Sequence, residues 1–252
     1  MNSFIPLGEA LDSNAGRFLC WPVYDREVAE ERLSQLRDLN IDSVALGGPH
    51  GVLGYPILGK GHVGVVIRAT YEGMEVALKC RRTDSDRATM DNEARLLMKA
   101  NEAGVGPEIY AHSKDFIIME KFEGPYFGEW VSENIEERDE IRKNVSAIIG
   151  IARKLDTARI DHGELTKIRR HYIVTEDGPR VIDFESASLG RTPQNLTCTV
   201  QSMFLQTRFA KVLAQAYPTP DRDELLMALR RYKVAPNEEN YKGVLRAINL
   251  SA

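Results

Sequence analysis

Two short stretches decide the fold: Gly59-Lys60-Gly61-His62-Val63-Gly64-Val65-Val66 and Val76-Ala77-Leu78-Lys79. The first fits the pattern G-x-G-x-x-G-x-V, in which glycines let the backbone approach phosphate groups without Cβ clashes. Residues 65–71 and 74–81 are β-branched or alternating runs joined by Glu72-Gly73, a dipeptide typical of a tight hairpin turn. A dinucleotide-binding glycine loop leads into a helix, so the hairpin argues against that fold.

A lysine and a glutamate follow the glycine-rich stretch. The two-residue period of a strand puts Ala77 and Lys79 on one face, where a small residue leaves room for a flat ring and the lysine reaches phosphates. Residues 84–86 offer caps for a helix predicted over 87–101. Glu93 lies on the apolar stripe of that helix, where a carboxylate needs a partner such as Lys79. The alternative is that both side chains face solvent.

Two acidic segments follow in the second half of the chain. Asp161-His162-Gly163-Glu164-Leu165-Thr166 comes directly after a predicted long helix that ends near Arg159. In Val181-Ile182-Asp183-Phe184-Glu185, an apolar strand delivers an acid into a loop, a position that suits Mg²⁺. Each acid alone is also compatible with a solvated surface residue. The order of the five elements along the chain is more informative than any one of them.

Composition is that of an ordinary globular protein. The chain has 252 residues, 33 Lys+Arg against 37 Asp+Glu, a net charge of −4 and 43% hydrophobic residues, enough for one large domain or two small ones. The mild acidity argues against a dedicated nucleic-acid-binding protein. Cys20, Cys80 and Cys198 show neither disulfide nor zinc spacing, and no stretch resembles a signal peptide or a membrane span. We therefore expect a cytoplasmic protein with no membrane partner.

The remaining elements follow from hydrophobic periodicity and turn residues. Residues 1–15 are predicted to be irregular, 17–21 a strand, 25–39 a helix capped by Asp25, and 42–46 a strand. The predicted elements after the hairpin are strands over 105–112, 116–120, 172–175 and 179–182, the long helix that ends near Arg159, and helices over 196–215, 221–232 and 238–248.

Together these motifs resemble the protein-kinase-like fold over about residues 54–190. The segments Val105-Gly106-Pro107, Ile118-Met119-Glu120 and His162-Gly163-Glu164-Leu165-Thr166 are similar to the small, atypical RIO-like and KEOPS-complex kinases. The segments Leu78-Lys79-Cys80-Arg81-Arg82-Thr83-Asp84 and Ile182-Asp183-Phe184-Glu185-Ser186-Ala187-Ser188 resemble, more narrowly, a family of predicted archaeal serine/threonine protein kinases.

The resemblance implies a role for each matching residue. Lys79, Glu164 and Asp183 would be catalytic, with Lys79 binding phosphates and pairing with Glu93 and Asp183 binding Mg²⁺. Met119 would lie behind the adenine ring, and the backbone of 120–122 would bind that ring. The implied nucleotide-binding set is Gly59, Gly61, Gly64, Ala77, Lys79, Glu93, Met119, Glu120 and Phe122.

Several positions depart from the family's pattern. Glu164 replaces the usual aspartate, and its carboxylate reaches one methylene further. Arg169 stands where an asparagine binds the second metal. If the loop is two residues longer, His171 takes that place, as a poor ligand for Mg²⁺ but a fair one for Mn²⁺ or Zn²⁺. The alternative for His171 is a strand-edge residue that touches no metal. Glu185 replaces a glycine, which restricts movement of the neighbouring phenylalanine.

Basic residues and a short tail complete the departures. Lys167, Arg169 and Arg170 either bind phosphate, an acidic partner or a nucleic acid, or simply face solvent. Only 69 residues follow Asp183, counting from 183 to 252, and they contain no Ala-Pro-Glu. The long activation segment and the peptide-docking helices of ordinary kinases are therefore expected to be absent.

We predict an α+β, bilobal protein-kinase-like fold: an N-terminal strand–helix–strand leader (1–50) packed on an antiparallel-sheet N-lobe (51–120), and a compact helical C-lobe (121–252). The expected function is transfer of the ATP γ-phosphoryl group to Ser/Thr hydroxyls of an unknown protein or of the chain itself, with Mg²⁺ or Mn²⁺. The alternatives are a nucleotide-binding pseudokinase or scaffold, a RIO-type ATPase acting on an RNA–protein assembly, and a small-molecule kinase.

Overall fold

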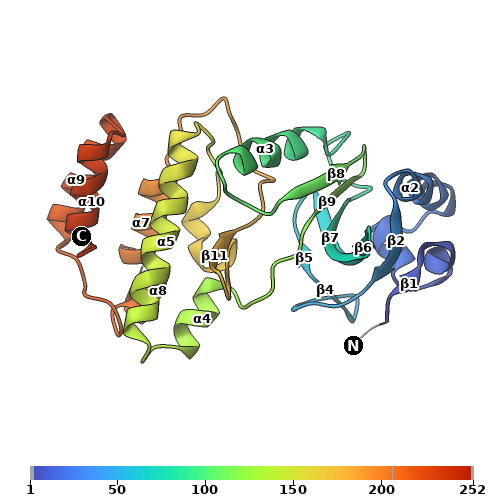
Figure 1. Ribbon diagram of the computed structural model, residues 1–252, viewed down its shortest axis with the longest axis horizontal. Coiled ribbons are helices and arrows are strands. Elements are labelled where there is room, and N and C mark those ends of the chain that lie inside the picture. Colours follow the sequence, from blue (N-terminus) through green and yellow to red (C-terminus); the bar gives the residue numbers. More distant parts are fainter. Residues whose placement is uncertain (1–2, 206, 251–252) are drawn as a thin grey trace. The chain divides into compact units, whose positions relative to one another are not determined.

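The computed structural model describes residues 3–205 and 207–250 and has an α+β fold with an antiparallel sheet and helices. The chain divides into two compact units (Figure 1). Unit 1 consists of Met1–Met98 and Pro107–Lys121, and unit 2 of Lys99–Gly106 and Phe122–Ala252. The expected domain limits of 1–50, 51–120 and 121–252 stay predictions.

An antiparallel sheet of seven strands forms the centre of unit 1. Its strands, in spatial order, are β1 (Ile5–Pro6), β2 (Ile41–Ala45), β6 (Gly64–Tyr71), β7 (Met74–Arg81), β9 (Phe116–Glu120) and β8 (Ile109–His112), with β5 (Gly59–Lys60) pairing to β6. The predicted β6–β7 hairpin is confirmed. Its turn residues Glu72 and Gly73 have φ of 50° and 78°, the left-handed conformation that such a turn requires.

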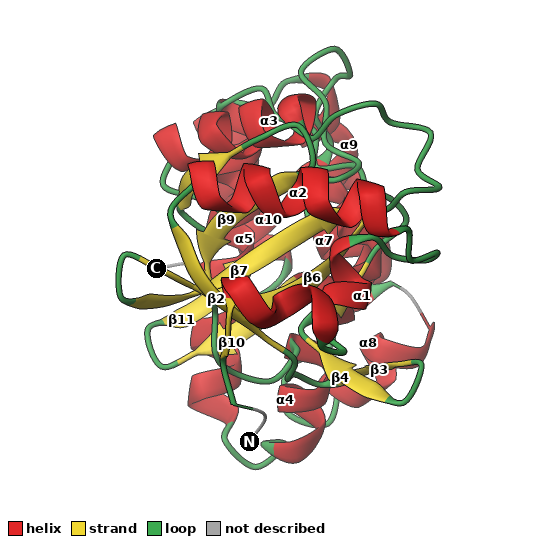
Figure 2. Ribbon diagram, turned by 90° about the vertical axis from the view of Figure 1, so that its right-hand side faces the viewer, coloured by secondary structure: helices red, strands yellow, loops and turns green. Residues whose placement is uncertain are grey.

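Helices cover one face of this sheet. Figure 2 shows α1 (Gly16–Leu19) and α2 (Arg26–Asp38) lying across the strands. Asp25 caps α2, as predicted, by accepting a hydrogen bond of 3.0 Å from the backbone N–H of Val28. Leu33 and Leu36 of α2 pack with buried residues of the sheet in one hydrophobic core.

The first twenty residues differ from the prediction. Residues 17–21 were expected to be a strand, but α1 is a helix, and the segment expected to be irregular forms β1 and the 3-10 helix η1 (Leu7–Asp12). Gly16 explains part of this difference, since a Cβ there would lie 2.4 Å from the carbonyl oxygen of Ala10. The glycine lets α1 pack closely on η1 and bury Phe18 and Leu19. The hydrophobic periodicity of the sequence does not reveal such a close backbone contact.

The helix α3 (Asp91–Glu102) begins four residues later than predicted. The backbone of Arg87, where the helix was expected to begin, is bound elsewhere. Its N–H donates to Ser85 Oγ at 3.2 Å, and its carbonyl accepts from Arg81 Nη1 at 3.0 Å. These contacts hold Arg87 outside the helix, so tertiary interactions override the local capping residues.

Two further corrections concern strands. The hairpin of β3 (His50–Val52) and β4 (Tyr55–Ile57) and the short strand β5 were not predicted. Strand β8 begins at Ile109 and not at 105, because Val105 N–H bonds to the carbonyl of Ala100 at the end of α3 and Gly106 has a φ of 81°.

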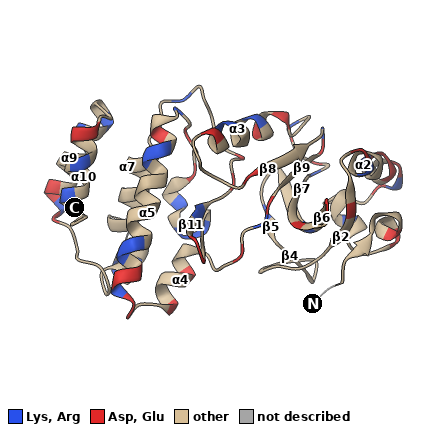
Figure 3. Cartoon of the chain, viewed as in Figure 1, with Lys and Arg blue, Asp and Glu red and all other residues tan. Residues whose placement is uncertain are grey.

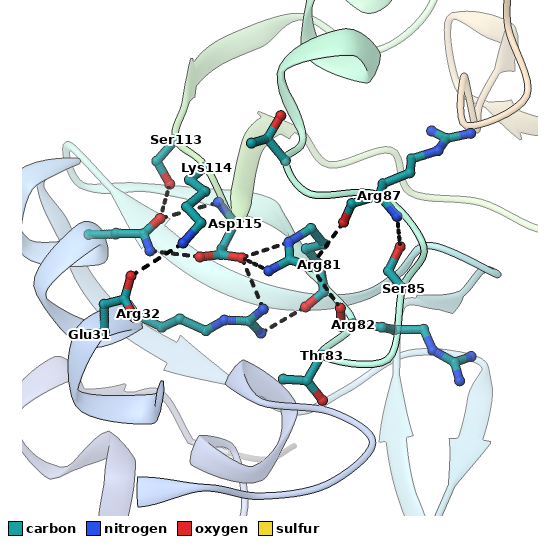
Figure 4. Close-up of polar contacts among 12 residues, drawn as sticks. Glu31, Arg32, Arg81, Arg82, Thr83, Ser85, Arg87, Ser113, Lys114 and Asp115 are labelled. Atoms are coloured by element: carbon teal, nitrogen blue, oxygen red, sulfur yellow. Dashed lines mark hydrogen bonds and ion pairs between the residues drawn. The ribbon is translucent and has the colours of Figure 1, made fainter. Parts of the chain in front are cut away.

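A buried carboxylate joins α2 to the sheet (Figure 4). Asp115 lies in the turn before β9 with its side chain only 3% exposed, and its Oδ1 is 3.0 Å from Arg32 Nη2 and 2.7 Å from Arg81 Nε. Gln35 Nε2 donates to Oδ2 at 2.8 Å. Burial alone would raise the pKa of Asp115, but Gln35 and the two arginines lower it below its ordinary value.

We predict that Asp115→Asn destabilises the protein by about 3 kcal/mol, because the buried guanidinium of Arg32 and the partly buried one of Arg81 lose their counter-charge. The free energy of unfolding in urea measures this loss. Glu31→Gln is the matched control, since the ion pair of Glu31 with Lys114 lies next to this cluster but both side chains are more than half exposed. Equal stability of the two variants would contradict the prediction.

Unit 2 is mainly helical and contains one small hairpin. Its elements are α4 (Phe127–Glu133), α5 (Arg138–Thr157), η2 (Leu165–Lys167), α6 (Ile168–His171), β10 (Tyr172–Thr175), β11 (Gly178–Val181), α7 (Asn195–Phe204), α8 (Thr207–Leu213), α9 (Arg222–Val234) and α10 (Glu238–Ala247). The predicted face of α5 is confirmed, since the six apolar residues predicted to lie on it are all buried: Ile141, Val145, Ile148, Ile149, Ala152 and Leu155. The hairpin β10–β11 is also confirmed.

The helical predictions of unit 2 need two corrections. Helix α4 was missed because seven residues are too few for a periodic pattern. The helix expected over 196–215 is divided into α7 and α8, and position 206 between them lies outside the described residues. None of the helices found in residues 3–205 and 207–250 combines the length and apolar character of a bilayer-spanning helix.

Candidate functional site

The glycine-rich segment forms the end of a β-hairpin in unit 1. Strand β5 pairs with β6 in the register Gly59↔Val66, and Gly61 N–H donates to the carbonyl of Gly64 at 2.8 Å across the turn. A Cβ at Gly64 would lie 2.9 Å from the carbonyl oxygen of Cys80 and 3.1 Å from Lys79 Cε. Glycine at this position therefore lets β6 pass closely over the lysine side chain.

The predicted ion pair between Lys79 and Glu93 is present and buried. Lys79 Nζ lies 2.5 Å from Glu93 Oε1, and both side chains are only 5% exposed. Strand β7 places the lysine in the middle of the sheet, between Val66 of β6 and Ile117 of β9, and α3 supplies the glutamate. Arg87 Nη1 is 4.0 Å from the other glutamate oxygen, Oε2.

The residues expected around an adenine ring lie in the middle of β7, at the end of β9 and just beyond β9. Ala77 is buried and pairs with Met119, which is half-buried. The backbone N–H of Glu120 donates to the carbonyl of Glu108 at 2.8 Å, so this N–H is already engaged. Phe122 belongs to unit 2, where the guanidinium of Arg180 lies 5.8 Å from its ring centre.

Glu164 is held by three neighbours within unit 2. Its Oε1 accepts from Ser186 Oγ at 2.9 Å, and its Oε2 lies 2.8 Å from Lys167 Nζ and 3.2 Å from His171 Nε2. The hydrogen bond from Lys167 is the main cause that holds the pKa of Glu164 below its ordinary value. Glu164 is therefore a carboxylate at neutral pH. Three donors leave about one of its four acceptor positions open.

Two histidines support the acid loop from behind. His162 is fully buried, and its Nε2 lies 3.0 Å from the carbonyl oxygen of Ile182, so this nitrogen donates. Burial is the main cause that lowers the pKa of His162 to about 4. Burial also lowers the pKa of His171, against the opposing charges of Asp183 and Glu164. Both imidazoles are therefore neutral at pH 7.

Asp183 follows β11 in a strained backbone conformation. Its φ is 69°, which is uncommon for a residue with a side chain and is often found at functional sites. The strand holds this position from both sides, since Ile182 N–H donates to the carbonyl of His171 at 3.0 Å and the Ile182 carbonyl accepts from His162. The Asp183 Oδ1 accepts a hydrogen bond of 3.4 Å from the backbone N–H of Glu185.

The donor set bears on which metal chemistry the site suits. Residues 3–205 and 207–250 contain no group of three His, Cys, Asp or Glu side chains placed to bind a metal by themselves. Mg²⁺ is usually held by one or two carboxylates together with substrate phosphates, and Asp183 is the carboxylate that the resemblance assigned to this role. His171, the second predicted ligand, directs Nε2 at Glu164 and is 6% exposed.

Supporting residues that sequence reasoning missed hold the loop around Glu164. Asn195 accepts from His162 N–H at 2.9 Å and donates to Asp156 and to the carbonyl of Ile160. Arg191 contacts Asp161 and the Ser186 carbonyl. A Cβ at Gly163 would lie 2.6 Å from that same carbonyl oxygen. The only signal in the sequence was the resemblance of residues 182–188, which includes Ser186 but neither Arg191 nor Asn195.

Within each unit, the structure brings several of the expected site residues together. Gly64, Ala77, Lys79 and Glu93 gather in unit 1, and Glu164, His171 and Asp183 gather in unit 2. Arg169 does not join the acids. Its exposed side chain lies against Gly128 of α4, where a Cβ would be 2.7 Å from Arg169 Cβ.

We predict that the protein loses stability as pH falls from about 6.5 to about 4, since the unfolded chain binds a proton that buried His162 does not. At pH values above 6.5, the ordinary pKa of histidine, the contribution of His162 to stability is fully present. Urea unfolding between about pH 7 and pH 5 measures the slope. His162→Phe should reduce the change of the free energy of unfolding with pH. The pH dependence that remains is the smaller contribution of His171. The control His62→Phe, at an exposed position, should leave the slope unchanged. A slope in His162→Phe equal to that of the unmodified protein would contradict the assignment.

Comparison with known proteins gives two relatives, and no family model matches the chain. An uncharacterized protein of Methanocaldococcus jannaschii is 32% identical over 79 residues, which cover 31% of this chain and 67% of the relative. The chain belongs to the same family as this archaeal protein. Because that relative is uncharacterized, membership of its family does not assign an activity to this protein.

The second relative has a name that suggests an activity. The Bacillus subtilis protein "Putative serine/threonine-protein kinase YrzF" is 30% identical over 144 residues, which cover 57% of this chain and 62% of the relative. The chain therefore spans no more than about two thirds of the length of either curated relative. This distant likeness suggests phosphotransfer and leaves the substrate and the mechanism open.

Proposed function

We propose that this protein is an atypical protein kinase, which transfers the γ-phosphoryl group of ATP to Ser/Thr hydroxyls of a protein, including its own. The observation that carries the proposal is the buried pair of Lys79 and Glu93 beside Gly64 of the glycine-rich hairpin. The similarity to a named serine/threonine kinase agrees with it. The proposal includes the bilobal kinase-like fold that the sequence predicts.

The burial of the Lys79–Glu93 pair is itself an argument for function. Removing two charges from water costs several kcal/mol, and such a pair is often no more stabilising than two apolar residues. Its advantage is positional, since Glu93 fixes Nζ beneath the glycine-rich hairpin. An ammonium group fixed in this way would bind the phosphates of ATP and stabilise charge that develops during transfer.

The acids of unit 2 would supply the other part of the chemistry. Asp183 would hold Mg²⁺, which would neutralise charge on the phosphates. Glu164 would use its one open acceptor position to orient the acceptor hydroxyl. The hydroxyl oxygen forms the new bond to the γ-phosphorus, the bond from that phosphorus to the β–γ bridging oxygen breaks, and the hydroxyl proton passes to the carboxylate and then to solvent. We assign His171 to the positioning of Glu164.

We predict that replacing Lys79 lowers phosphoryl transfer by on the order of a hundredfold, because a fixed donor to the transition state is lost. Lys79→Met alone would leave the Glu93 charge buried, so the test variant combines it with Glu93→Gln. Transfer from γ-labelled ATP and ATP affinity by calorimetry are the measurements. Lys114→Ala, at an exposed lysine, is the control. Unchanged transfer in the folded double variant would remove the kinase assignment.

We predict that Asp183→Asn weakens the metal-dependent part of ATP binding by at least about tenfold, since a neutral amide replaces the anionic ligand. Asparagine tolerates the positive φ of this position, so the fold should persist. ATP affinity is measured with Mg²⁺, with Mn²⁺ and with a chelator. Asp177→Asn, at an exposed turn, is the control. Metal-independent ATP affinity in both variants would exclude Asp183 as the ligand.

We predict that Glu164→Gln lowers turnover by about 10²–10⁴ and leaves ATP affinity nearly unchanged, because the side chain keeps its shape but loses its charge and basicity. Glu164→Asp should show no gain, since shortening the side chain withdraws it from Lys167 and His171. Initial rates of protein phosphorylation measure both variants. A large increase in Glu164→Asp would show that the loop has the geometry of ordinary kinases.

A nucleotide-binding pseudokinase is the second candidate, favoured by the three donors that already occupy Glu164. Incubation with γ-labelled ATP separates the candidates. Label on protein supports the kinase, label on an added small molecule indicates a small-molecule kinase, and label released as phosphate indicates a RIO-type ATPase. ATP binding without turnover indicates a pseudokinase.

A further inference from the structure

A groove in unit 2 has a strongly unbalanced charge. It lies beside α4, the η2–α6 segment and α8, and its volume is about 770 Å³. Four basic side chains line it, Lys167, Arg169, Arg170 and Arg208, against the single carboxylate of Glu129. Elsewhere in unit 2 the charges are mixed, and Figure 3 shows both acidic and basic residues near each end of α5.

Most of the positive charge in this groove is not neutralised by the protein. Arg169, Arg170 and Arg208 are exposed, and none of them forms an ion pair with a carboxylate within residues 3–205 and 207–250. Arg191 of the same unit, by contrast, pairs with Asp161 at 2.5 Å. Unpaired cations that converge on one groove attract an anionic ligand.

The groove is shaped by packing as well as by charge. Gly128 of α4 is buried, and a Cβ there would lie 2.8 Å from Arg169 Nε, so this glycine lets the arginine lie along the helix. The floor is partly apolar: Ile168 and Phe209 are 1% and 4% exposed. Ser202 Oγ donates to the carbonyl of Thr166 at 2.8 Å and fixes the loop at the same wall.

These features favour a polypeptide over a nucleic acid. Single-stranded nucleic acids bind aromatic side chains on which bases stack. Phe209, the one aromatic residue of the lining, packs edge-on against Phe127 at 5.5 Å and offers no exposed ring face. The net charge of −4 is also unlike a surface built for a phosphate backbone. An apolar floor between cationic walls fits an extended chain with acidic side chains.

We infer that this groove binds an acidic segment of the protein substrate, close to the Ser/Thr hydroxyl that is phosphorylated. The inference rests on the proposed kinase function and specifies its substrate class. Lys167 connects the two sites, since it lines the groove and its Nζ lies 2.8 Å from Glu164. A peptide held in the groove by its carboxylates would lie next to the acid that orients the hydroxyl.

The test measures binding, which needs no catalysis. The probe is a fluorescent peptide with one serine among glutamates, compared by anisotropy with a serine–lysine peptide and a single-stranded RNA oligonucleotide of equal negative charge. The groove variant combines Arg170→Glu with Arg208→Glu. The control combines Arg222→Glu with Arg230→Glu, two exposed arginines of α9 outside the groove, and keeps the net charge equal.

The expected result is salt-dependent binding of the glutamate peptide, weakened at least about tenfold in the groove variant and within about twofold of the unmodified protein in the control. Equal binding by both variants, no binding of the glutamate peptide, or tighter binding of the RNA through the same arginines would overturn the inference. If the peptide binds but no phosphoryl transfer occurs, the proposed peptide-binding role of the groove stands and the proposed kinase function is wrong.

Discussion

The arrangement of unit 1 depends on the contact between Asp115 and the guanidinium groups of Arg32 and Arg81. A carboxylate this deeply buried is tolerated only with paired charges and satisfied hydrogen bonds, so its partners fix where α2, β7 and the β8–β9 turn meet. The same arginine, Arg81, binds the carbonyl of Arg87, whose guanidinium approaches Glu93. The cluster that joins the leader helix to the sheet thus also determines where α3 begins and where Glu93 lies.

Much of unit 1 follows from local sequence because its elements have strong periodicity. The β6–β7 hairpin depends on Gly73 and on alternation in its strands, and both can be recognised in the sequence. The Lys79–Glu93 contact was also predictable, since a carboxylate on an apolar helix face requires a partner and few candidates exist. The glycine at 64 was recognised for approach to phosphates, but the structure shows that it also makes room for the lysine side chain.

The features that could not be predicted depend on contacts between residues far apart in the sequence. Arg32 and Asp115 are separated by 83 residues, and each alone resembles an ordinary surface charge. Asn195 likewise closes the loop around His162 across 33 residues. The start of α3 was misplaced for the same reason, because Arg81 binds the backbone that local caps would have made helical. Periodicity describes which face is buried, whereas such polar contacts specify which segments meet.

Glu164 shows how a departure from a family's pattern can be accommodated by its surroundings. Its longer side chain reaches Lys167 and His171 at one oxygen and Ser186 at the other, and these donors keep it ionised. Because little proton movement accompanies a loose transition state, a carboxylate with a lowered pKa is a strong enough base to take the hydroxyl proton. Orientation of the hydroxyl is the greater requirement, and a carboxylate held from three sides is better suited to that role than a mobile one. The same contacts would serve a nucleotide-binding scaffold, so the one open acceptor position on Glu164 is where the two functions differ physically.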